Sequence, residues 1–354
     1  MIQLIPASKT LLSELVFKLK SIRLGLLLFT LPTINPFSGC AFKVYTAHMR
    51  IGITGGAGFI GANLARALIN LEYEVSIIDD LSNGNLANLS NLNYKFVHGS
   101  ITSNRDLDEF SKNLNYIVHL AARGSVPRSI EDPLTTHNIN VDGTLNLLEV
   151  ARNKKIPIIF SSSSSVYGQN TKLPKSEKDW LLPISPYAAS KLACEGMFSG
   201  WANAYDMNVL VLRFFNVFGP FQSPDSPYAA VIPKWCLSII KNKNIQVYGD
   251  GEQIRDFTYV DDVVNVIIAA IQGNITSSSA INLAFGKKIS LNGIINLLRS
   301  INPNFEVNYL PSRPGDIRNS LSDGILIKER FPKVISTDFK YNLATTFDWI
   351  RSNF

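Results

Sequence analysis

The sequence contains few of the residues that build disulfide frameworks and metal sites. Its 354 residues include three cysteines (Cys40, Cys194 and Cys236), none close to another, and four scattered histidines. A disulfide-stapled fold needs an even set of closely spaced cysteines, and a zinc site needs clustered Cys and His ligands. Neither pattern is present in the sequence, so we expect neither a disulfide scaffold nor a metal site.

Charge and long apolar runs are also scarce. Charged residues make up 18% of the chain, and the net charge is +6. Residues 1–48 hold five basic residues against Glu14 alone, so they carry four of the six net charges. The remainder has no basic excess that would indicate nucleic-acid binding. The most apolar early stretch, residues 24–34, contains a proline and is too short to span a bilayer as a helix, so we expect no stable membrane insertion.

The first 48 residues differ in composition from the rest. Basic residues precede the apolar stretch 24–34, and small residues follow it up to Cys40, as in a secretory or lipoprotein leader. The alternative is that translation begins at Met49, where an apolar strand starts at once. We favour an extension that the folded protein does not need, either a leader or a misassigned start.

A glycine-rich turn follows the first apolar segment after Met49. IGIT (51–54) predicts a strand, and Gly55, Gly58 and Gly61 then open a segment with helical periodicity. This spacing allows a tight turn, a close approach of backbone to a pyrophosphate, and packing of helix on strand. A second predicted strand, 74–79, ends in Asp79, whose carboxylate can accept hydrogen bonds from ribose hydroxyls and repel a 2′-phosphate. The unit therefore predicts a dinucleotide site that favours NAD over NADP.

Further apolar segments predict an α/β protein with a doubly wound parallel sheet. Helical segments alternate with strands expected at 94–98, 116–120, 156–160 and 209–215. Ligands bind such sheets at the carboxyl ends of the strands. The serine run 161–165 directly follows strand 156–160, so we place it in the binding crevice and not in a linker.

Tyr187 and Lys191 lie four residues apart in a predicted helix, 186–205, so they share one helical face. A phenol with an ordinary pKa of about 10 is a poor base at neutral pH. A nearby ammonium and a positive nicotinamide ring would favour the phenolate. A serine hydroxyl across the cleft could then bind both the phenol and a reacting oxygen.

Seven ordered motifs make the chain resemble the extended short-chain dehydrogenase/reductase superfamily. They are TGGAGFIG, DDLSNGN, HLAARGSVPRSIEDP, NVDGTLNLLE, SSSSSVYG, PYAASK and LRFFNVFGPFQ. The resemblance spans about residues 49–350 and is strongest to NAD-dependent UDP-glucose and UDP-N-acetylglucosamine 4-epimerases of surface-polysaccharide synthesis. It implies a Rossmann domain over 49–215 and, mainly over 216–354, a smaller α/β substrate-binding lobe with segments returning to the Rossmann domain.

The resemblance also implies roles for individual residues. Ser163, four residues before Tyr167, corresponds to the catalytic serine or threonine that acts with Tyr187 and Lys191. Ser100 departs from the family, because relatives carry there an acid that contacts adenine. The cofactor-binding residues that the family implies are Gly55, Gly58, Phe59, Ile60, Gly61, Asp79, Asn83, Ala121, Ala122, Asn140, Tyr187, Lys191 and Phe215.

For the substrate, the family implies that Asn216, Arg255 and Arg313 bind a UDP diphosphate. Arginine offers paired donors to phosphate oxygens, which suits this role. Ser320 matches a sugar-pocket position where a tyrosine restricts the site to plain hexoses and a small residue admits an N-acetyl group. Gly124, Ser125 and Ser163 also face the sugar in relatives.

The resemblance further implies a homodimer through the helices expected around 137–153 and 186–205. The nucleotide cofactor favours a cytoplasmic location.

Other activities share these features. A UDP-glucuronate 4-epimerase needs the same redox cycle. A sugar-nucleotide dehydratase or decarboxylase shares the fold and the Tyr–Lys pair, but dehydratases carry Asp-Glu after the catalytic Thr, where this chain has Ser164 and Ser165. An NAD-binding regulator would be expected to lack part of the catalytic set, whereas Ser163, Tyr187 and Lys191 are all present.

Overall fold

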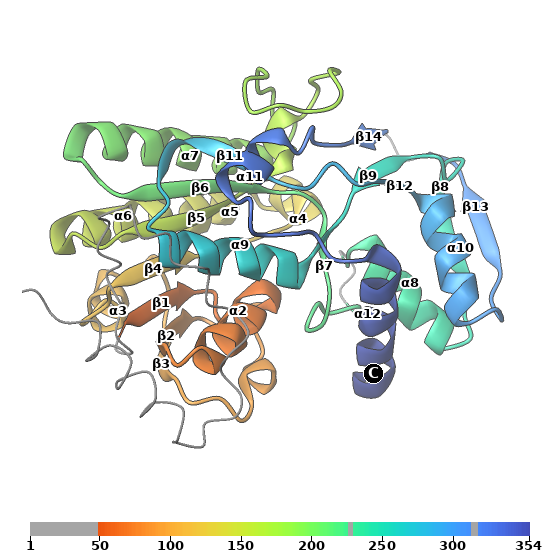
Figure 1. The fold of residues 1–354 in the computed structure, drawn as a ribbon, viewed down its shortest axis with the longest axis horizontal. Helices are drawn as coiled ribbons and strands as arrows, with labels where there is room; N and C mark the ends of the chain where they lie inside the picture. The colour runs from red at the N-terminus through yellow and green to blue at the C-terminus, as the bar shows by residue number, and fades with distance from the viewer. Residues whose placement is uncertain (1–48, 226–228, 313–317) are drawn as a thin grey trace, which may run out of the picture. The chain divides into compact units, whose positions relative to one another are not determined.

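A seven-stranded parallel sheet forms the centre of the molecule (Figure 1). The computed structural model describes residues 49–225, 229–312 and 318–354. The strand order is β11-β6-β5-β4-β1-β2-β3, and every adjacent pair is parallel. The predicted doubly wound Rossmann-type sheet is therefore confirmed. The strands are β1 (Arg50–Thr54), β2 (Glu74–Asp79), β3 (Lys95–His98), β4 (Tyr116–His119), β5 (Ile158–Ser163), β6 (Val209–Phe214) and β11 (Ser277–Leu283).

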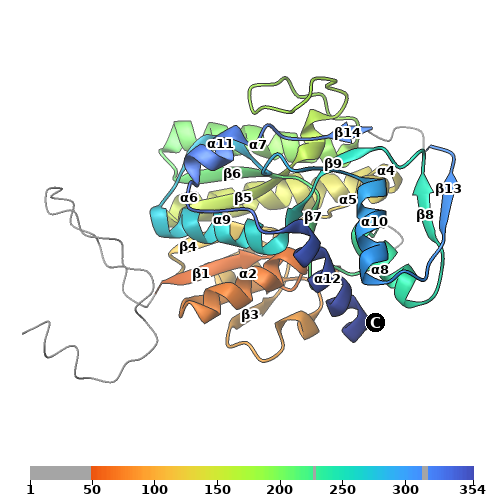
Figure 2. The same cartoon turned by 45° about the vertical axis from the view of Figure 1, so that its right-hand side comes forward.

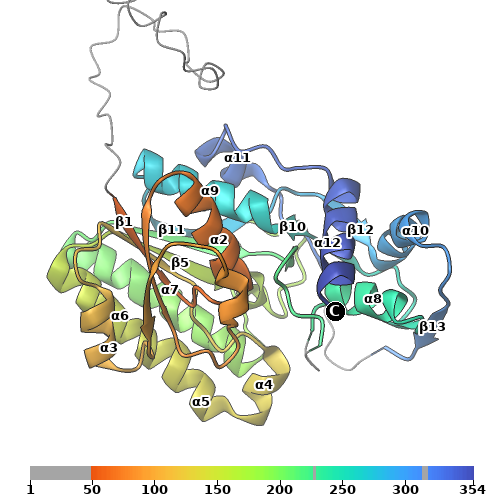
Figure 3. The same ribbon diagram turned by 90° about the horizontal axis from the view of Figure 1, so that it is seen from below.

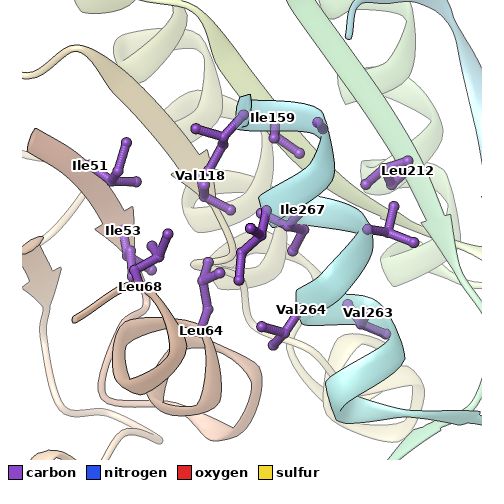
Figure 4. Close-up of a cluster of buried hydrophobic side chains, with 14 of the residues drawn as sticks. Ile51, Ile53, Leu64, Leu68, Val118, Ile159, Leu212, Val263, Val264 and Ile267 are labelled. Carbon is purple, nitrogen blue, oxygen red and sulfur yellow. The ribbon is translucent and has the colours of Figure 1, made fainter. Parts of the chain in front are cut away.

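Helices cover both faces of this sheet (Figure 3). One face carries α2 (Phe59–Asn70) and α9 (Val260–Gly273), and the other carries α3 (Asn104–Phe110), α6 (Gly143–Lys154) and α7 (Pro186–Tyr205). Successive strand residues point to opposite faces of the sheet. A continuous apolar strand therefore contributes side chains to the hydrophobic core on each face. Leu210 and Leu212 of β6 pack on the α2–α9 side, and Val209 and Val211 pack on the other. Figure 4 shows Leu64 and Leu68 of α2 and Val264 and Ile267 of α9 in the hydrophobic core on the α2–α9 side of the sheet.

Two elements differ from their predicted bounds by more than one residue. Strand β5 begins at Ile158 and continues through Ser163, because its residues 161–163 pair with β6 residues 212–214. The helix expected over 137–153 is interrupted and begins earlier in the chain. It consists of α4 (Val126–Glu131), α5 (Pro133–His137), a π-helical turn (Asn138–Asp142) and α6. Asp132 caps α5 by accepting from Thr135 N, and Pro133 occupies the first turn, where a missing N–H costs nothing.

The chain after residue 216 forms a second group of elements beside the carboxyl ends of the strands (Figure 2). Its core contains Phe218, Trp235, Ile294 and Phe347. The predicted domain boundary at 215/216 stays a prediction. The elements α9 and β11 follow it in the chain but belong to the seven-stranded sheet and its covering helices. The second group comprises β7 (Val217–Phe218), α8 (Val231–Ile240), β8 (Ile245–Tyr248), β9 (Ile254–Asp256), β10 (Thr258–Tyr259), β12 (Lys288–Ser290), α10 (Leu291–Ile301), β13 (Val307–Leu310), β14 (Asn319–Ser320) and α12 (Phe339–Asn353), with α11 (Ile325–Arg330) against β11.

Two further expectations concern the N-terminal extension and membrane insertion. The predicted extension 1–48 lies outside the described residues. Among the helices that the structure describes from residue 49 onward, none combines the length and apolarity needed to cross a membrane.

Candidate active site

The glycine turn between β1 and α2 leaves no room for side chains. Gly55 has φ +69°, and a Cβ there would lie 2.8 Å from Ala121 N. A Cβ on Gly61 would lie 2.3 Å from Gly55 O and 2.6 Å from Gly56 Cα. Gly58 caps α2 without any side-chain hydrogen bond, so no capping side chain satisfies the first amides of α2. Backbone can therefore approach an anion closely at the positive end of the helix.

A cavity of about 360 Å³ lies beside this turn, at the carboxyl ends of β1, β2 and β4. Asp79 lies at its wall and accepts hydrogen bonds from Ala57 N and Leu81 N, both at 2.9 Å. Burial raises the pKa of this carboxyl, and the two backbone bonds lower it. The two amides orient the carboxylate at the strand end, where it can accept from hydroxyl groups. The predicted residues that line this cavity are Gly55, Gly58, Asp79, Asn83, Ala121 and Ala122, and Ser100 lines it as well.

A second cavity, of about 520 Å³, contains the three predicted catalytic residues. Ser163 ends β5, whereas Tyr187 and Lys191 come from the first two turns of α7. Ser185 caps α7 by accepting from Ala188 N at 3.1 Å, which fixes where the helix begins. Tyr187 is hydrogen-bonded to Ser163, and Lys191 Nζ donates to Ser161 O at 2.8 Å. The helix face and the strand end thus hold the serine, phenol and ammonium in one wall.

The electrostatics of this wall refine the sequence-based prediction. Burial raises the pKa of Tyr187, and the hydrogen bond from Ser163 lowers it. Burial lowers the pKa of Lys191 to about 8. Of the described residues, Ser163 and not Lys191 is the neighbour that lowers the pKa of Tyr187. Burial thus opposes ionisation of Tyr187, and the hydrogen bond with Ser163 favours it.

The other predicted residues fall into three groups. Phe59, Ile60, Gly61, Gly124, Ser125 and Asn216 line the second cavity with the catalytic three. Asn216 has φ +32°, a conformation that asparagine tolerates, and its Nδ2 donates to Asp256 O at 3.1 Å. Asn140 and Phe215 are buried behind the cavities: Asn140 Nδ2 donates to Ser190 Oγ at 3.0 Å, and Phe215 packs against Tyr167.

The third group lies in the second lobe. Arg255 on β9 donates from Nη1 to Arg318 O at 2.7 Å. Ser320 on β14 is paired with Arg255, so the two positions are adjacent in one small sheet. The buried Asp256 accepts from Ser322 N at 3.3 Å and Gly286 N at 3.0 Å, which ties β9 to the segment after Ser320. Arg313 lies outside the described residues.

Sequence reasoning missed several residues of these walls. Arg128 of α4 lines both cavities and donates from Nη1 to Asn83 Oδ1 at 2.7 Å. Phe214, and not its predicted neighbour Phe215, lines the second cavity together with Val217. Ser162, from the serine run that the sequence placed in the crevice, lines it as well. Strand alternation could have separated Phe214 from Phe215, but only once the sheet face had been assigned.

Within the described residues, no group of His, Cys, Asp or Glu side chains could hold a metal ion. His119 is fully buried between Thr54 Oγ1 at 2.7 Å and Thr144 Oγ1 at 2.9 Å. Burial lowers its pKa to about 3, so it is neutral. This histidine supports the carboxyl end of β4 and does not act as a ligand.

Comparison with known proteins agrees with this geometry. Residues 51–284 match the model of the "NAD dependent epimerase/dehydratase family". The UDP-glucose 4-epimerase of Mycolicibacterium smegmatis is 34% identical over 315 residues, which cover 86% of this chain and 99% of that protein.

Two solved structures are similar over most of this chain. A UDP-N-acetylglucosamine 4-epimerase from Methanobrevibacter ruminantium M1, in complex with UDP-N-acetylmuramic acid, has a TM-score of 0.83 at 38% identity, covering 87% of this chain and 99% of that one. A UDP-glucuronic acid 4-epimerase from Bacillus cereus, in complex with UDP-glucuronic acid and NAD, has a TM-score of 0.79 at 29% identity, covering 86% and 100%.

Proposed function

Because the chain belongs to the NAD-dependent epimerase/dehydratase family, we propose that it is a 4-epimerase that interconverts UDP-GlcNAc and UDP-GalNAc. UDP-glucose and UDP-galactose are expected as further substrates, and the pathway is surface-polysaccharide synthesis. The observation that carries the proposal is the common wall formed by Ser163, Tyr187 and Lys191 in a cavity that begins at the glycine turn. The 38% identity to a UDP-N-acetylglucosamine 4-epimerase supports the choice of sugar.

The residues present fit NAD. Gly55 and Gly61 leave no room for a side chain, and the uncapped first turn of α2 suits a pyrophosphate. Asp79 would bind the adenosine ribose, and Lys191 would hold the nicotinamide ribose. Bound NAD supplies the acceptor and donor of hydride, together with the positive charge that favours ionised Tyr187.

The protein side chains then move and hold one proton. Ionised Tyr187 removes the proton of the sugar's 4-hydroxyl, and Ser163 hydrogen-bonds the same oxygen and relays that proton. Loss of this proton together with the C4 hydride, which bound NAD would accept, would give a 4-keto sugar. That sugar would rotate while its diphosphate stays anchored, for which Asn216, Arg255 and Arg313 are the proposed residues. Tyr187 would return the proton to the 4-oxygen when bound NAD gives the hydride back to the opposite face of the sugar, so the reaction would consume neither the proton nor the cofactor.

A substitution at Ser320 tests the proposed choice of sugar. A tyrosine in place of Ser320 should fill the space proposed for the acetamido group. Epimerisation of UDP-GlcNAc should then fall by about tenfold or more, while UDP-glucose turnover persists. Ser320→Ala is the matched control, because it keeps the position small and should leave the two rates in their original ratio. Rates for both sugars, measured by NMR for the three proteins, decide the point, and an equal loss for both sugars in the tyrosine variant would remove Ser320 from the sugar pocket.

A panel of substrates tests the proposed reaction against its alternatives. Purified protein is mixed with UDP-GlcNAc, UDP-glucose and UDP-glucuronate, and the products are identified by NMR. The proposal predicts C4 epimers of the first two. Exclusive turnover of UDP-glucuronate would indicate a UDP-glucuronate 4-epimerase, and a 4-keto-6-deoxy product would indicate a dehydratase. Bound NAD without any turnover would indicate a regulator. The homodimer and the cytoplasmic location stay predictions.

A further inference from the structure

A third residue of α7 faces the serine run. Glu195 lies four residues after Lys191 and eight after Tyr187, so the three share one helical face. Its Oε1 accepts from Ser162 Oγ at 2.5 Å. Ser162 lies between Ser161, whose carbonyl oxygen accepts from Lys191, and Ser163, which is hydrogen-bonded to Tyr187. Each of the three consecutive serines at the end of β5 is therefore attached to this helix face.

The carboxylate of Glu195 is held from its other side. Arg213 of β6 donates from Nε to Oε1 at 2.9 Å and from Nη2 to Oε2 at 2.7 Å. Its Nη1 donates to Tyr167 OH at 2.8 Å, and Tyr167 OH donates to Asn282 Oδ1 at 2.8 Å. All of these side chains are buried. A bidentate pair leaves the carboxylate one orientation, so the position of Ser162 is defined by rigid contacts.

A gain in stability does not by itself explain why Glu195 and Arg213 form a buried ion pair. Removing two charges from water costs several kcal/mol, and a well-packed apolar pair is often at least as stable. Glu195 and Arg213 are 8% and 5% exposed, so water screens the pair little. The Ser162 contact connects the pair to the catalytic cavity, which Ser162 lines. The ion pair is therefore explained by its contact with the catalytic cavity, through Ser162, and not by packing.

The charge of Glu195 also acts on Lys191. Burial lowers the pKa of Lys191, and the nearby Cys194 and Glu195 raise it. Burial raises the pKa of Cys194, so its thiol is neutral near pH 7. In the described part of the chain, Lys191 also acts on the buried, neutral His119 of β4, and Tyr187 lies one turn before Lys191 on the same helix. Across the helix on β6, Arg213 forms the ion pair with Glu195.

We propose that Glu195 is a positioning residue for the reaction: it fixes Ser162, and with it the end of β5, against α7, and it keeps a negative charge beside Lys191. This inference rests on the proposed function, because the geometry that it protects is the Ser163–Tyr187–Lys191 wall. Glu195 itself does not line the catalytic cavity. Its contribution should therefore appear in kcat and in the pH dependence, and not in substrate affinity.

Glu195→Gln keeps the shape of the side chain and removes its charge. We expect kcat to fall about tenfold or more, with KM and NAD content unchanged. Without the negative charge the pKa of Lys191 falls further below its ordinary value, so the ammonium is lost at lower pH. The alkaline limb of kcat/KM should therefore move to lower pH. If the single variant fails to fold, the double variant Glu195→Met/Arg213→Met leaves no unpaired charge. It should show the same fall in kcat, because Ser162 loses its acceptor, and a smaller shift of the alkaline limb, because the positive charge of Arg213 is removed as well.

Two comparisons separate positioning from general stability. Ser162→Ala removes the hydroxyl but keeps the ion pair, so kcat should fall without a pH shift. Glu149→Gln removes a carboxylate that binds Arg152 and Trp201 between α6 and α7, away from the site, and it should change neither kcat nor the limb. Nitrogen NMR of labelled lysine in the full chain gives a readout that needs no turnover, in which the Lys191 titration should move to lower pH in Glu195→Gln.

An inactive wild-type protein would contradict the proposed function and not this inference, because the Lys191 titration can still be measured. Wild-type kcat and an unmoved alkaline limb in Glu195→Gln would overturn the inference. An unchanged Lys191 titration in that variant would overturn it as well.

Discussion

Replacing Tyr187 with phenylalanine should lower the rate of UDP-sugar epimerisation by about a thousandfold or more, because a positioned acid–base group contributes typically 10²–10⁴. The phenol is the group placed to remove and return the proton of the 4-hydroxyl, and it is hydrogen-bonded to Ser163 at the end of β5. The substitution deletes one oxygen and keeps the ring, so the packing of α7 should be preserved. The NAD content of the purified protein should remain close to that of the wild type.

Tyr205→Phe provides the matched control at the far end of α7. Tyr205 is half exposed, and its ring lies under Arg152, away from both cavities. This variant should keep both activity and NAD. Rates measured by NMR, together with NAD released on denaturation, separate loss of chemistry from loss of cofactor. Appreciable activity in Tyr187→Phe would remove Tyr187 from the proposed mechanism.

Gly61→Ala should abolish NAD binding and destabilise the fold. The new Cβ would lie 2.3 Å from Gly55 O and 2.6 Å from Gly56 Cα, so backbone must move. Overpacking of this kind costs about 1–3 kcal/mol or more. The displaced turn would no longer present the backbone and the first amides of α2 to a pyrophosphate. The measurements are NAD content after purification and the thermal unfolding midpoint with and without added NAD.

Gly200→Ala is the corresponding control in α7. A Cβ at Gly200 would meet nothing within 4 Å, so the substitution should be neutral or stabilise the helix by up to about 1 kcal/mol. Its NAD content should match the wild type. A Gly61→Ala protein that binds NAD as tightly as Gly200→Ala would contradict the role given to the glycine turn.

Much of the fold was predictable because its signals are local. The alternation of apolar residues with turns located the strands from β1 to β6, whereas β11 was not predicted, and the bounds of β2 and α7 are those predicted. The glycine spacing predicted the turn for the same reason, since Gly58 and Gly61 lie against Gly55 O within that turn. Gly55 itself lies against the segment after β4. The broken helix before α6 also carried a local signal, because Asp132 and Pro133 form a cap and first turn.

The parts that could not be predicted depend on pairing between distant segments. Serine has little preference for strands, so the pattern of β5 stopped at Phe160, whereas pairing with β6 extends the strand through Ser163. The Ser162–Glu195–Arg213 contacts join three elements, and only the four-residue spacing of Tyr187, Lys191 and Glu195 hinted at them. The environment of Tyr187 was not predictable either, since burial, which raises its pKa, is a property of the folded site.

The fate of a deuterium label at C4 of UDP-GlcNAc tests the central claim most directly. If hydride leaves and returns within one bound cofactor, NMR and mass spectrometry should find UDP-GalNAc with the deuterium retained at C4, and solvent should contribute none. Loss of the label to solvent, or a product that is not the C4 epimer, would contradict the account.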